Sequence, residues 1–294
     1  MHFCFVILHY NAIDVTRRCI GLLLDNFVAK DISIVVVDNA SPDGSGAELQ
    51  TCFSEESRVH LILLDRNEGF ARGNNAGYRL AVKKLNPDFI IMMNNDVFVH
   101  DRDFTDKLAK EYRRSPFAVL GPDIVSKTTG RHQNPFALEP MTEKEARRRK
   151  KMIDNNLRHF LFHYICWGIK RIFKIERNSR AFETPARGCV LHGACLIFSK
   201  DFINSREYAF NPGTFLFVEE DILQYECAKA GLTMRYSPLL KVEHLEDASS
   251  KTVFRTKYFR TKSQYIHSSY SLGVLLDLMK KSSNENILLS HSKA

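Results

Sequence analysis

The chain has 294 residues, of which 44% are hydrophobic, and its 42 Lys and Arg against 34 Asp and Glu give a formal net charge of +8. This length and apolar content predict a folded globular protein with one large or two modest cores. Seven cysteines, an odd number without a Cys-x-x-Cys pair, argue against a disulfide framework and a structural zinc site and favour a reducing cytosol.

The N-terminal part of the chain alternates strand and helix patterns. Runs rich in Val, Ile and Phe predict strands, and the stretches between them predict helices. This βαβαβαβ series indicates a mainly parallel sheet that is covered by helices on both faces. Ligands of such sheets lie at the carboxyl ends of the strands, so polar residues that follow a strand are candidate site residues. The predicted strands are residues 3–8, 32–37, 59–64 and 89–93, and the predicted helices are 15–27, 47–53 and 70–84.

Asp38 follows the second predicted strand and precedes a Ser-Pro-Asp-Gly turn. A carboxylate there can accept a hydrogen bond from a base or a ribose hydroxyl while the amides of the turn stay free. The alternative is an Asp that only caps the loop. An ordinary dinucleotide site is disfavoured, because the turn after the first strand, residues 9–14, has no glycine that would let a pyrophosphate approach. The sequence therefore predicts a nucleotide contact at Asp38 in a different arrangement.

A glycine-containing segment follows the third predicted strand. Gly69 and Gly73 allow close approach of the backbone, and a helix that begins near Phe70 would direct its N-terminal amides at an anion. Arg72 can add a bidentate contact to a phosphate. A tight turn into a packed helix explains the same pattern equally well.

The apolar run of the fourth predicted strand ends in Asn94, Asn95 and Asp96. Such a run is typical of a strand that is buried on both faces, so Asp96 is placed where a metal or a substrate can reach it. A hard cation such as Mg²⁺ or Mn²⁺ takes oxygen ligands and often shares them with substrate phosphates. The alternative is a strand-ending turn, which Asn and Asp also favour.

Three carboxylates, Glu219, Glu220 and Asp221, follow an apolar run in the second half of the chain. Clustered acids repel one another, so at least one is expected to have a raised pKa, which suits a general base at neutral pH. The alternative is a helix whose first turn favours acids through its dipole. His244 ends a short strand, where a lone histidine is more often structural than a ligand. The predicted elements here are a strand at 189–198, a helix at 219–230 and short strands at 234–236 and 241–244.

In this order and spacing, the four segments resemble the inverting family-2 glycosyltransferases of the GT-A fold, in particular bacterial rhamnosyl-, galactosyl- and glucosyltransferases of cell-surface polysaccharide assembly. The resemblance covers residues 3–123 and 188–250, and the pattern Asn-Glu-Gly-Phe-Ala-x-Gly-x-Asn matches residues 67–75. It implies an α/β fold with a mixed, mainly parallel Rossmann-like sheet. It also implies a hexosyltransferase that moves a sugar from a UDP- or dTDP-sugar to a lipid-linked saccharide, assisted by Mg²⁺ or Mn²⁺.

The resemblance also assigns a metal site and nucleotide contacts. The triplet Asn94-Asn95-Asp96 corresponds to the family's Asp-x-Asp metal motif with Asn in the first place, so Asp96 becomes the main protein ligand. His244 fits the place of a histidine that sometimes binds the metal. The implied nucleotide contacts are Tyr10, Asn11, Asp38, Asn39, Asn67, Gly69, Phe70, Arg72, Asn74 and Asn95.

The family's catalytic acidic pair falls on Glu219 and Glu220, and the resemblance implies that Glu220 is the base, with Asp221 as its rival. Gly193 and Ala194 match a small-residue segment on the acceptor side. The base would remove a proton from the acceptor hydroxyl, which attacks the anomeric carbon from the face opposite the nucleotide. The expected product has inverted anomeric configuration, without a covalent intermediate.

Four parts of the chain are expected. They are a nucleotide-sugar-binding half at 1–125, a basic amphipathic helical insertion at 126–187, an acceptor and catalytic half at 188–250, and a C-terminal helical tail at 251–294. Residues 143–180 contain 12 Lys and Arg against 4 Asp and Glu, beside several aromatic residues, as in helices that lie on anionic membranes. We therefore expect a cytoplasmic protein, peripheral on the inner face of the plasma membrane. The alternative is a solvated hairpin or an oligomer contact.

Two other classes of function stay open. A nucleotidyltransferase also uses a strand-end carboxylate and a metal, but it is expected to have a glycine-rich phosphate loop after the first strand, which this chain lacks. A non-enzymatic nucleic-acid-binding protein is suggested only by the net charge, and the balanced charge outside the basic segment disfavours it, so no nucleic-acid partner is expected. We expect no leader peptide and no spanning helix. The sequence leaves the sugar, the acceptor and homo-oligomerisation open.

Overall fold

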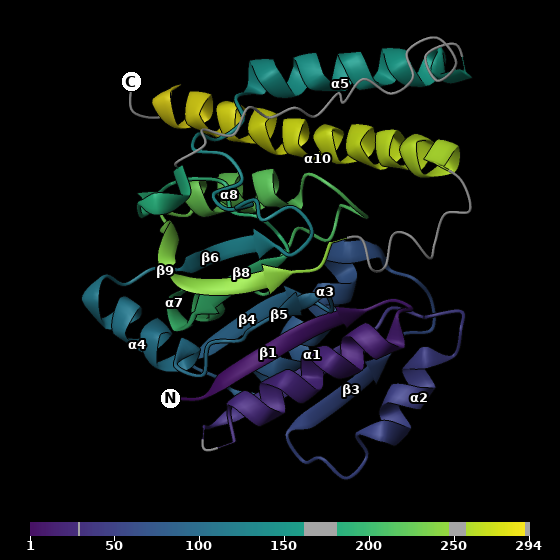
Figure 1. Ribbon diagram of the computed structural model, residues 1–294. Helices are drawn as coiled ribbons and strands as arrows, with labels where there is room; N and C mark the ends of the chain where they lie inside the picture. Colours follow the sequence, from purple (N-terminus) through teal and green to yellow (C-terminus); the bar gives the residue numbers. More distant parts are fainter. Residues whose placement is uncertain (29, 162–180, 247–256, 292–294) are drawn as a thin grey trace.

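The computed structural model describes residues 1–28, 30–161, 181–246 and 257–291 (Figure 1). Its strands are β1 Phe3–His9, β2 Ile32–Asp38, β3 Val59–Leu63, β4 Phe89–Asn94, β5 Val97–Phe98, β6 Val119–Ser126, β7 Ala186–Arg187, β8 Cys195–Ser199 and β9 Met234–His244. They form one sheet in the order β3-β2-β1-β4-β8-β6-β9-β5, with β7 beside β9. Strands β8, β5 and β7 run against the other six. The predicted mixed, mainly parallel sheet is confirmed.

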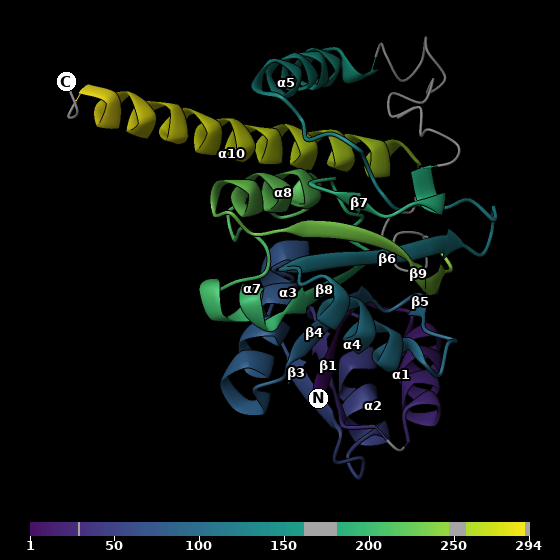
Figure 2. The ribbon, with the colours of Figure 1, turned by 90° about the vertical axis from the view of Figure 1, so that its left-hand side faces the viewer.

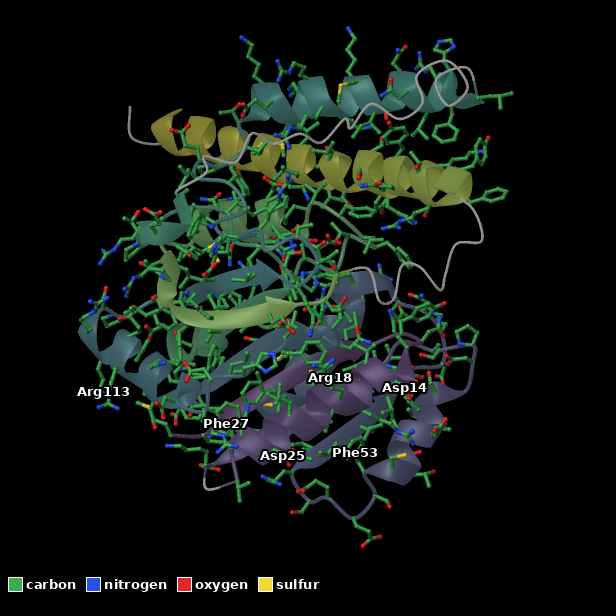
Figure 3. The ribbon with its side chains drawn as sticks, in the orientation of Figure 1. Asp14, Arg18, Asp25, Phe27, Phe53 and Arg113 are labelled. Atoms are coloured by element: carbon green, nitrogen blue, oxygen red, sulfur yellow. The ribbon has the colours of Figure 1, made fainter. Side chains whose placement is uncertain are left out.

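Helices cover both faces of the sheet, as predicted. Successive strand residues point to opposite faces, so Phe5 and Ile7 of β1 enter one core while Cys4 and Val6 enter the other. Figure 3 shows the charged residues Asp14, Arg18 and Asp25 along the exposed side of the first helix. On the first face lie α1 Ile13–Asn26, α2 Ser45–Cys52 and α4 Phe104–Arg114, and on the second lie α3 Gly69–Leu80, α7 Lys200–Ser205 and α8 Glu219–Lys229.

Two more helices, α5 Glu143–Arg158 and α10 Lys257–His291, lie outside the sheet layers: α10 lies over α8, and α5 lies on the outer side of α10 (Figure 2). The contact is apolar, since Ile153 of α5, Ile222 of α8 and Leu275 of α10 belong to one buried cluster. The predicted basic insertion at 126–187 therefore contains the helix α5, which packs against α10. Its continuation, residues 162–180, lies outside the described residues, as do residues 251–256.

Three elements differ from the sequence prediction. The strand expected at 189–198 begins only at Cys195. Residues 189–194 leave the sheet: Val190 forms an isolated bridge with Ala137, and the Ala194 carbonyl accepts from the Asn94 backbone N at the end of β4. The third helix changes to a π-helix at Ala81–Leu85. The two short strands at 234–236 and 241–244 are one strand, β9, whose register with β6 shifts between Pro122 and Asp123. In the part of the chain that the structure describes, no helix has the length and apolar character needed to cross a membrane.

Candidate functional site

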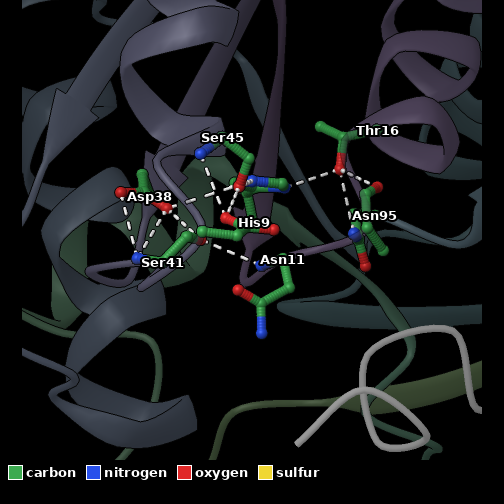
Figure 4. Close-up of polar contacts among 9 residues, drawn as sticks. His9, Asn11, Thr16, Asp38, Ser41, Ser45 and Asn95 are labelled. Carbon is green, nitrogen blue, oxygen red and sulfur yellow. Dashed lines mark hydrogen bonds and ion pairs between the residues drawn. The ribbon is translucent and has the colours of Figure 1, made fainter.

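A buried polar network joins the carboxyl ends of β1 and β4 to the start of α2 (Figure 4). The ring of His9 is fully buried and is hydrogen-bonded to Thr16 Oγ1 at 2.7 Å and to Ser45 Oγ at 2.8 Å. Thr16 Oγ1 also accepts a hydrogen bond from Asn95 Nδ2 at 2.9 Å. Burial lowers the pKa of His9, although the nearby Asp38 opposes this shift. The network fixes the position of the predicted nucleotide motif relative to the predicted metal motif.

Asp38 is buried at the end of β2, and its carboxylate orders the turn that follows. It accepts hydrogen bonds from the Ser41 backbone N at 3.2 Å and from Ser41 Oγ at 2.5 Å. The Asn11 backbone N donates to Ser41 Oγ at 2.9 Å, which ties the two strand ends together and places the half-buried Tyr10 beside them. Asn11 Oδ1 is buried and has no hydrogen-bond partner among the described residues. A Cβ at Gly46 would lie 2.2 Å from Asp38 Oδ2, so close packing requires glycine there.

The backbone amides of residues 68–70, where α3 begins, already have acceptors in the protein. Asn39 Oδ1 accepts from the first at 2.9 Å, Asn67 Oδ1 from the second at 2.9 Å, and the Phe215 carbonyl from the third at 2.7 Å. Gly69 has a φ of +78°, and a Cβ on it would lie 2.3 Å from that carbonyl oxygen. The expectation that these amides face an anion therefore finds no support in this geometry. That these residues contact a nucleotide stays a prediction, and such a contact would use atoms other than these three amides.

Arg72 and Asn74 of α3 contact other parts of the protein. Arg72 is exposed, donates from Nε to the Pro212 carbonyl at 2.8 Å and lies 3.6 Å from Glu68 Oε2. Asn74 is buried and donates to the Phe70 carbonyl at 3.0 Å within the helix. The structure thus brings Arg72 to the loop that precedes α8. Its contact with a phosphate, and that of Asn74 with a nucleotide, stay predictions.

Asp96 and His244 come together, although they are far apart in the sequence. Asp96 Oδ1 and His244 Nε2 are 3.3 Å apart, and both residues are buried. The Leu245 backbone N donates to the Asp96 carbonyl at 2.9 Å, which fixes the end of β9 against the turn after β4. Within the described residues, His244 Nε2 has no hydrogen-bond partner. The atom therefore lies buried beside a carboxylate oxygen.

This pair fits a divalent cation. The described residues contain no group of three or more His, Cys, Asp or Glu that could hold a metal by themselves. Mg²⁺ and Mn²⁺ at phosphate sites use only one or two protein ligands and take the rest from the substrate and water. Two cis ligands at about 2.1 Å from one octahedral cation lie about 3 Å apart, close to the observed spacing of Asp96 and His244. These residues are therefore suitable as the protein share of a metal site.

Gly193 and Ala194 connect the acidic cluster to the metal motif. The Gly193 backbone N donates to Glu220 Oε1 at 3.2 Å, and a Cβ on Gly193 would lie 2.8 Å from that oxygen. The next residue, Ala194, accepts from the Asn94 backbone N at 3.0 Å. Two adjacent residues thus place Glu220 beside the triplet that ends in Asp96. The structure brings together the predicted base, the predicted acceptor segment and the predicted metal motif.

The three carboxylates at the start of α8 have different surroundings. Burial, and then the charge of Glu220, raises the pKa of Glu219 to about 8, and its Oε1 has no hydrogen-bond partner in the described part of the chain. Burial also raises the pKa of Glu220, against the hydrogen bond from Gly193. Burial and Glu220 raise the pKa of Asp221 to about 7, while Arg149 of α5 opposes the shift. Among the three, Glu220 makes the contact with the acceptor segment.

Backbone strain is concentrated around this site. Phe217 and Val218, directly before Glu219, both have a φ of +70°, which is unfavourable for a β-branched residue such as valine. Strained residues of this kind persist where the surrounding structure fixes them, often at functional sites. Six of the seven non-glycine residues with positive φ in the described ranges border the site: Asn11, Ala12, Ala40, Phe217, Val218 and Glu246.

Sequence reasoning did not find the residues that hold the site together. His9 lies in the turn predicted after the first strand and Thr16 in the predicted first helix, and neither position gives an indication of a shared network. Gln133 lies in a segment without a motif and His192 directly before the small-residue segment, yet Gln133 bonds His244 and the His192 ring lies 6.0 Å from the His244 ring. The sequence indicated this polar network only through the polar residues that follow the predicted strands.

Comparisons with known proteins identify the family of the chain and one sequence relative. The model of the family described as "Glycosyl transferase family 2" matches residues 4–175. Agl10 of Haloferax volcanii, a hexosyltransferase of low-salt glycan biosynthesis, is 28% identical over 93 residues, which are 32% of this chain and 28% of that protein.

Solved structures share the fold. GalNAc-T7 with UDP, GalNAc and Mn²⁺ has a TM-score of 0.57 at 16% identity, over 88% of this chain and 49% of that chain. Residues 1–349 of S. aureus TarS with UDP-GlcNAc have a TM-score of 0.54 at 13% identity, over 90% of this chain and 66% of that chain. The chain thus spans less than two thirds of each of these three proteins.

Proposed function

Because the chain belongs to glycosyltransferase family 2 and has the GT-A fold, we propose that it transfers a hexose from a UDP- or dTDP-sugar to a lipid-linked saccharide in polysaccharide biosynthesis. The observation that carries the proposal is the pair Gly193 and Ala194, which bonds Glu220 on one side and the metal motif on the other. Family membership favours this function over a nucleotidyltransferase or a nucleic-acid-binding protein.

Glu220 is the proposed general base. Its half-buried carboxylate has a raised pKa, which keeps it basic enough to accept a proton from a sugar hydroxyl near neutral pH. The Gly193 N–H holds Oε1 and leaves Oε2 for the acceptor. The hydroxyl then attacks the anomeric carbon from the face opposite the nucleotide, which gives inversion. Glu219 is more deeply buried, and Asp221 lies in the field of Arg149 of α5, so the Gly193 contact distinguishes Glu220 from both.

Asp96 and His244 are the proposed metal ligands. A divalent cation bound there would neutralise the charge that develops on the leaving nucleoside diphosphate. Asp38 and Asn11 bind the base and ribose end, and Asn11 Oδ1 offers a buried acceptor to that end. The UDP-GlcNAc of the TarS structure and the UDP of the GalNAc-T7 structure support a nucleotide-sugar donor, and the Mn²⁺ of GalNAc-T7 supports the metal.

A ligand screen tests this assignment. Binding to the folded state raises the melting temperature by mass action. We expect UDP- or dTDP-sugars with Mn²⁺ to stabilise the protein and GDP-sugars to do so less, and we expect Asp96→Ala to remove the metal-dependent part of the shift. If no nucleotide sugar changes the melting temperature, with or without Mn²⁺, the proposed donor class is wrong.

The outer face of α5 is the proposed contact with an anionic membrane. Four exposed cations, Lys144, Arg147, Arg148 and Lys151, follow one another at i, i+3, i+4 and i+7, so they share one face of the helix. The opposite face carries buried residues such as Ile153. Because α5 packs on α10, which lies over α8 (Figure 2), and Arg149 of α5 acts on Asp221, docking by α5 would bring the side of the molecule with the acidic cluster toward a lipid-linked acceptor.

Vesicle flotation tests the membrane contact. Each Lys or Arg near an anionic surface contributes about 1 kcal/mol, and the attraction weakens with salt. We expect binding to vesicles with one quarter phosphatidylglycerol, no binding to pure phosphatidylcholine, and loss of binding when the four α5 cations are replaced by Glu. A matched control replaces four exposed cations of the body by Glu: Lys83, Lys84, Lys110 and Arg113. Equal loss in both variants would contradict a specific surface on α5.

A further inference from the structure

His244 belongs to a chain of polar side chains that ends outside the proposed metal site. Its Nδ1 is hydrogen-bonded to Gln133 Oε1 at 2.7 Å, and Gln133 Nε2 donates to Glu246 Oε1 at 2.5 Å. His244 and Gln133 are both less than one tenth exposed. The Gln133 backbone N donates to the Ile124 carbonyl at 2.8 Å, so the residue is anchored to β6. These contacts therefore connect the half-buried Glu246, through Gln133 and His244, to Asp96.

We propose that Gln133 is a positioning residue that fixes the tautomer of His244, so that Nε2 is an available metal ligand. Only the claim about metal binding rests on the proposed function. The hydrogen bond between Gln133 and His244 is present in the protein without any ligand. Gln133 lies outside every motif found in the sequence.

The donor and acceptor chemistry of the chain determines the direction of each hydrogen bond. A carboxylate can only accept, so the Glu246 carboxylate requires the amide nitrogen of Gln133 to face it. The amide oxygen must then face His244. An amide oxygen also only accepts, so His244 Nδ1 must carry the hydrogen. The remaining ring nitrogen, Nε2, then has its lone pair directed at the space beside Asp96 Oδ1.

The buried surroundings of Nε2 agree with this assignment. The atom is buried and has no hydrogen-bond partner among the described residues, which is costly unless a ligand uses it. Metal-binding histidines generally donate their other ring N–H to an oxygen atom, which orients the ring and makes the ligand more basic. Here the oxygen comes from an amide whose own orientation is set by Glu246, a residue with a left-handed φ of +64°.

Two measurements test the proposal. The first is the tautomer of His244 in the metal-free protein, read from long-range ¹H–¹⁵N NMR of histidine-labelled samples and assigned with His244→Asn. We expect a hydrogen on Nδ1 and none on Nε2 in the wild type, and loss of that single tautomer in Gln133→Leu. The second is the Kd for Mn²⁺, from the EPR signal of free Mn²⁺, which should rise about 10- to 100-fold in Gln133→Leu.

A charge-exchange pair separates positioning from packing. Gln133→Glu alone places two carboxylates in contact and should weaken Mn²⁺ binding. The double variant Gln133→Glu/Glu246→Gln reverses the outer hydrogen bond but keeps an oxygen acceptor on His244 Nδ1, so it should restore both the tautomer and the affinity. A control, Gln224→Leu, removes another buried glutamine, which donates to the Gly188 carbonyl, and should change neither.

The results distinguish this inference from the proposed function. If the wild type binds Mn²⁺ and Gln133→Leu binds it equally well, or if the tautomer is the same in both, the positioning role is wrong while the metal site stands. If His244 carries hydrogens on both ring nitrogens near neutral pH, it is an ion-pair partner of Asp96, and the inference is wrong. If the wild type does not bind Mn²⁺, the metal assignment itself fails.

Discussion

Replacement of Glu220 by Gln removes the proposed base and keeps most of its contacts. Gln is nearly isosteric, and its side-chain oxygen can still accept from the Gly193 N–H, which the wild type does at 3.2 Å. The fold should therefore persist. Because burial raises the pKa of Glu220, the wild-type site includes an energetic cost of ionisation that the variant lacks. We expect the melting temperature of Glu220→Gln to equal or exceed that of the wild type.

The expected loss of activity follows from the role of a general base. Proton removal by a positioned base contributes about 10²- to 10⁴-fold to a rate, which corresponds to about 3 to 5 kcal/mol of transition-state stabilisation. The loss should appear in kcat, because Glu220 contacts the acceptor segment and has no role in the proposed binding of the donor. Its raised pKa also predicts that wild-type kcat/KM rises with pH as Glu220 ionises. Glu220→Gln should abolish that rise.

The assay is release of nucleoside diphosphate from the donor in the presence of acceptor, together with donor binding measured separately. Glu207→Gln, which changes an exposed glutamate, is the control for the substitution itself. A larger loss of kcat in Asp221→Asn than in Glu220→Gln would identify Asp221 as the base. Near-normal kcat in Glu220→Gln, with intact donor binding, would refute the reasoning.

The other predictions concern stability and the nucleotide pocket. The pKa of Glu219 is raised to about 8 in the folded protein, so the wild type should lose stability as pH rises from about 4.5 to about 8. Glu219→Gln should remove this pH dependence, which urea unfolding at several pH values would show. Gly46→Ala should weaken donor binding more than it lowers kcat, because its Cβ would displace Asp38. Arg235→Met should cost about 2 kcal/mol in urea unfolding, because the buried Glu111 loses its 2.9 Å partner but keeps Arg114 and Ser237.

The sheet and the general place of the site were predictable because they depend on local patterns. Continuous apolar runs give buried strands, and polar residues that follow such runs must lie at their ends, so Asp38 and Asp96 could be placed without a structure. Likewise the capping box of Thr142 and Glu145 begins a helix that the charge pattern also indicates.

The contacts across the site were not predictable, because they join residues that are far apart in sequence. Nothing in the pattern around Gln133 indicates that it meets His244, which is 111 residues away. The strand expected from residue 189 failed for a related reason. Residues 189–194 are apolar enough for a strand, but they leave the sheet so that Gly193 can meet Glu220. The hydrogen bonds of the amides at 68–70 with Asn39, Asn67 and Phe215 also depend on tertiary structure.

The most direct test of the account is nucleoside diphosphate release from UDP- and dTDP-sugars with membrane lipid extract as acceptor, measured for the wild type, Glu220→Gln and Asp96→Ala. The account predicts Mn²⁺-dependent release by the wild type that EDTA abolishes and added Mn²⁺ restores. Glu220→Gln should bind donor but release nucleotide about 10²- to 10⁴-fold more slowly, and Asp96→Ala should lose metal-dependent binding and turnover together. Metal-independent release at equal rates in all three proteins would contradict it.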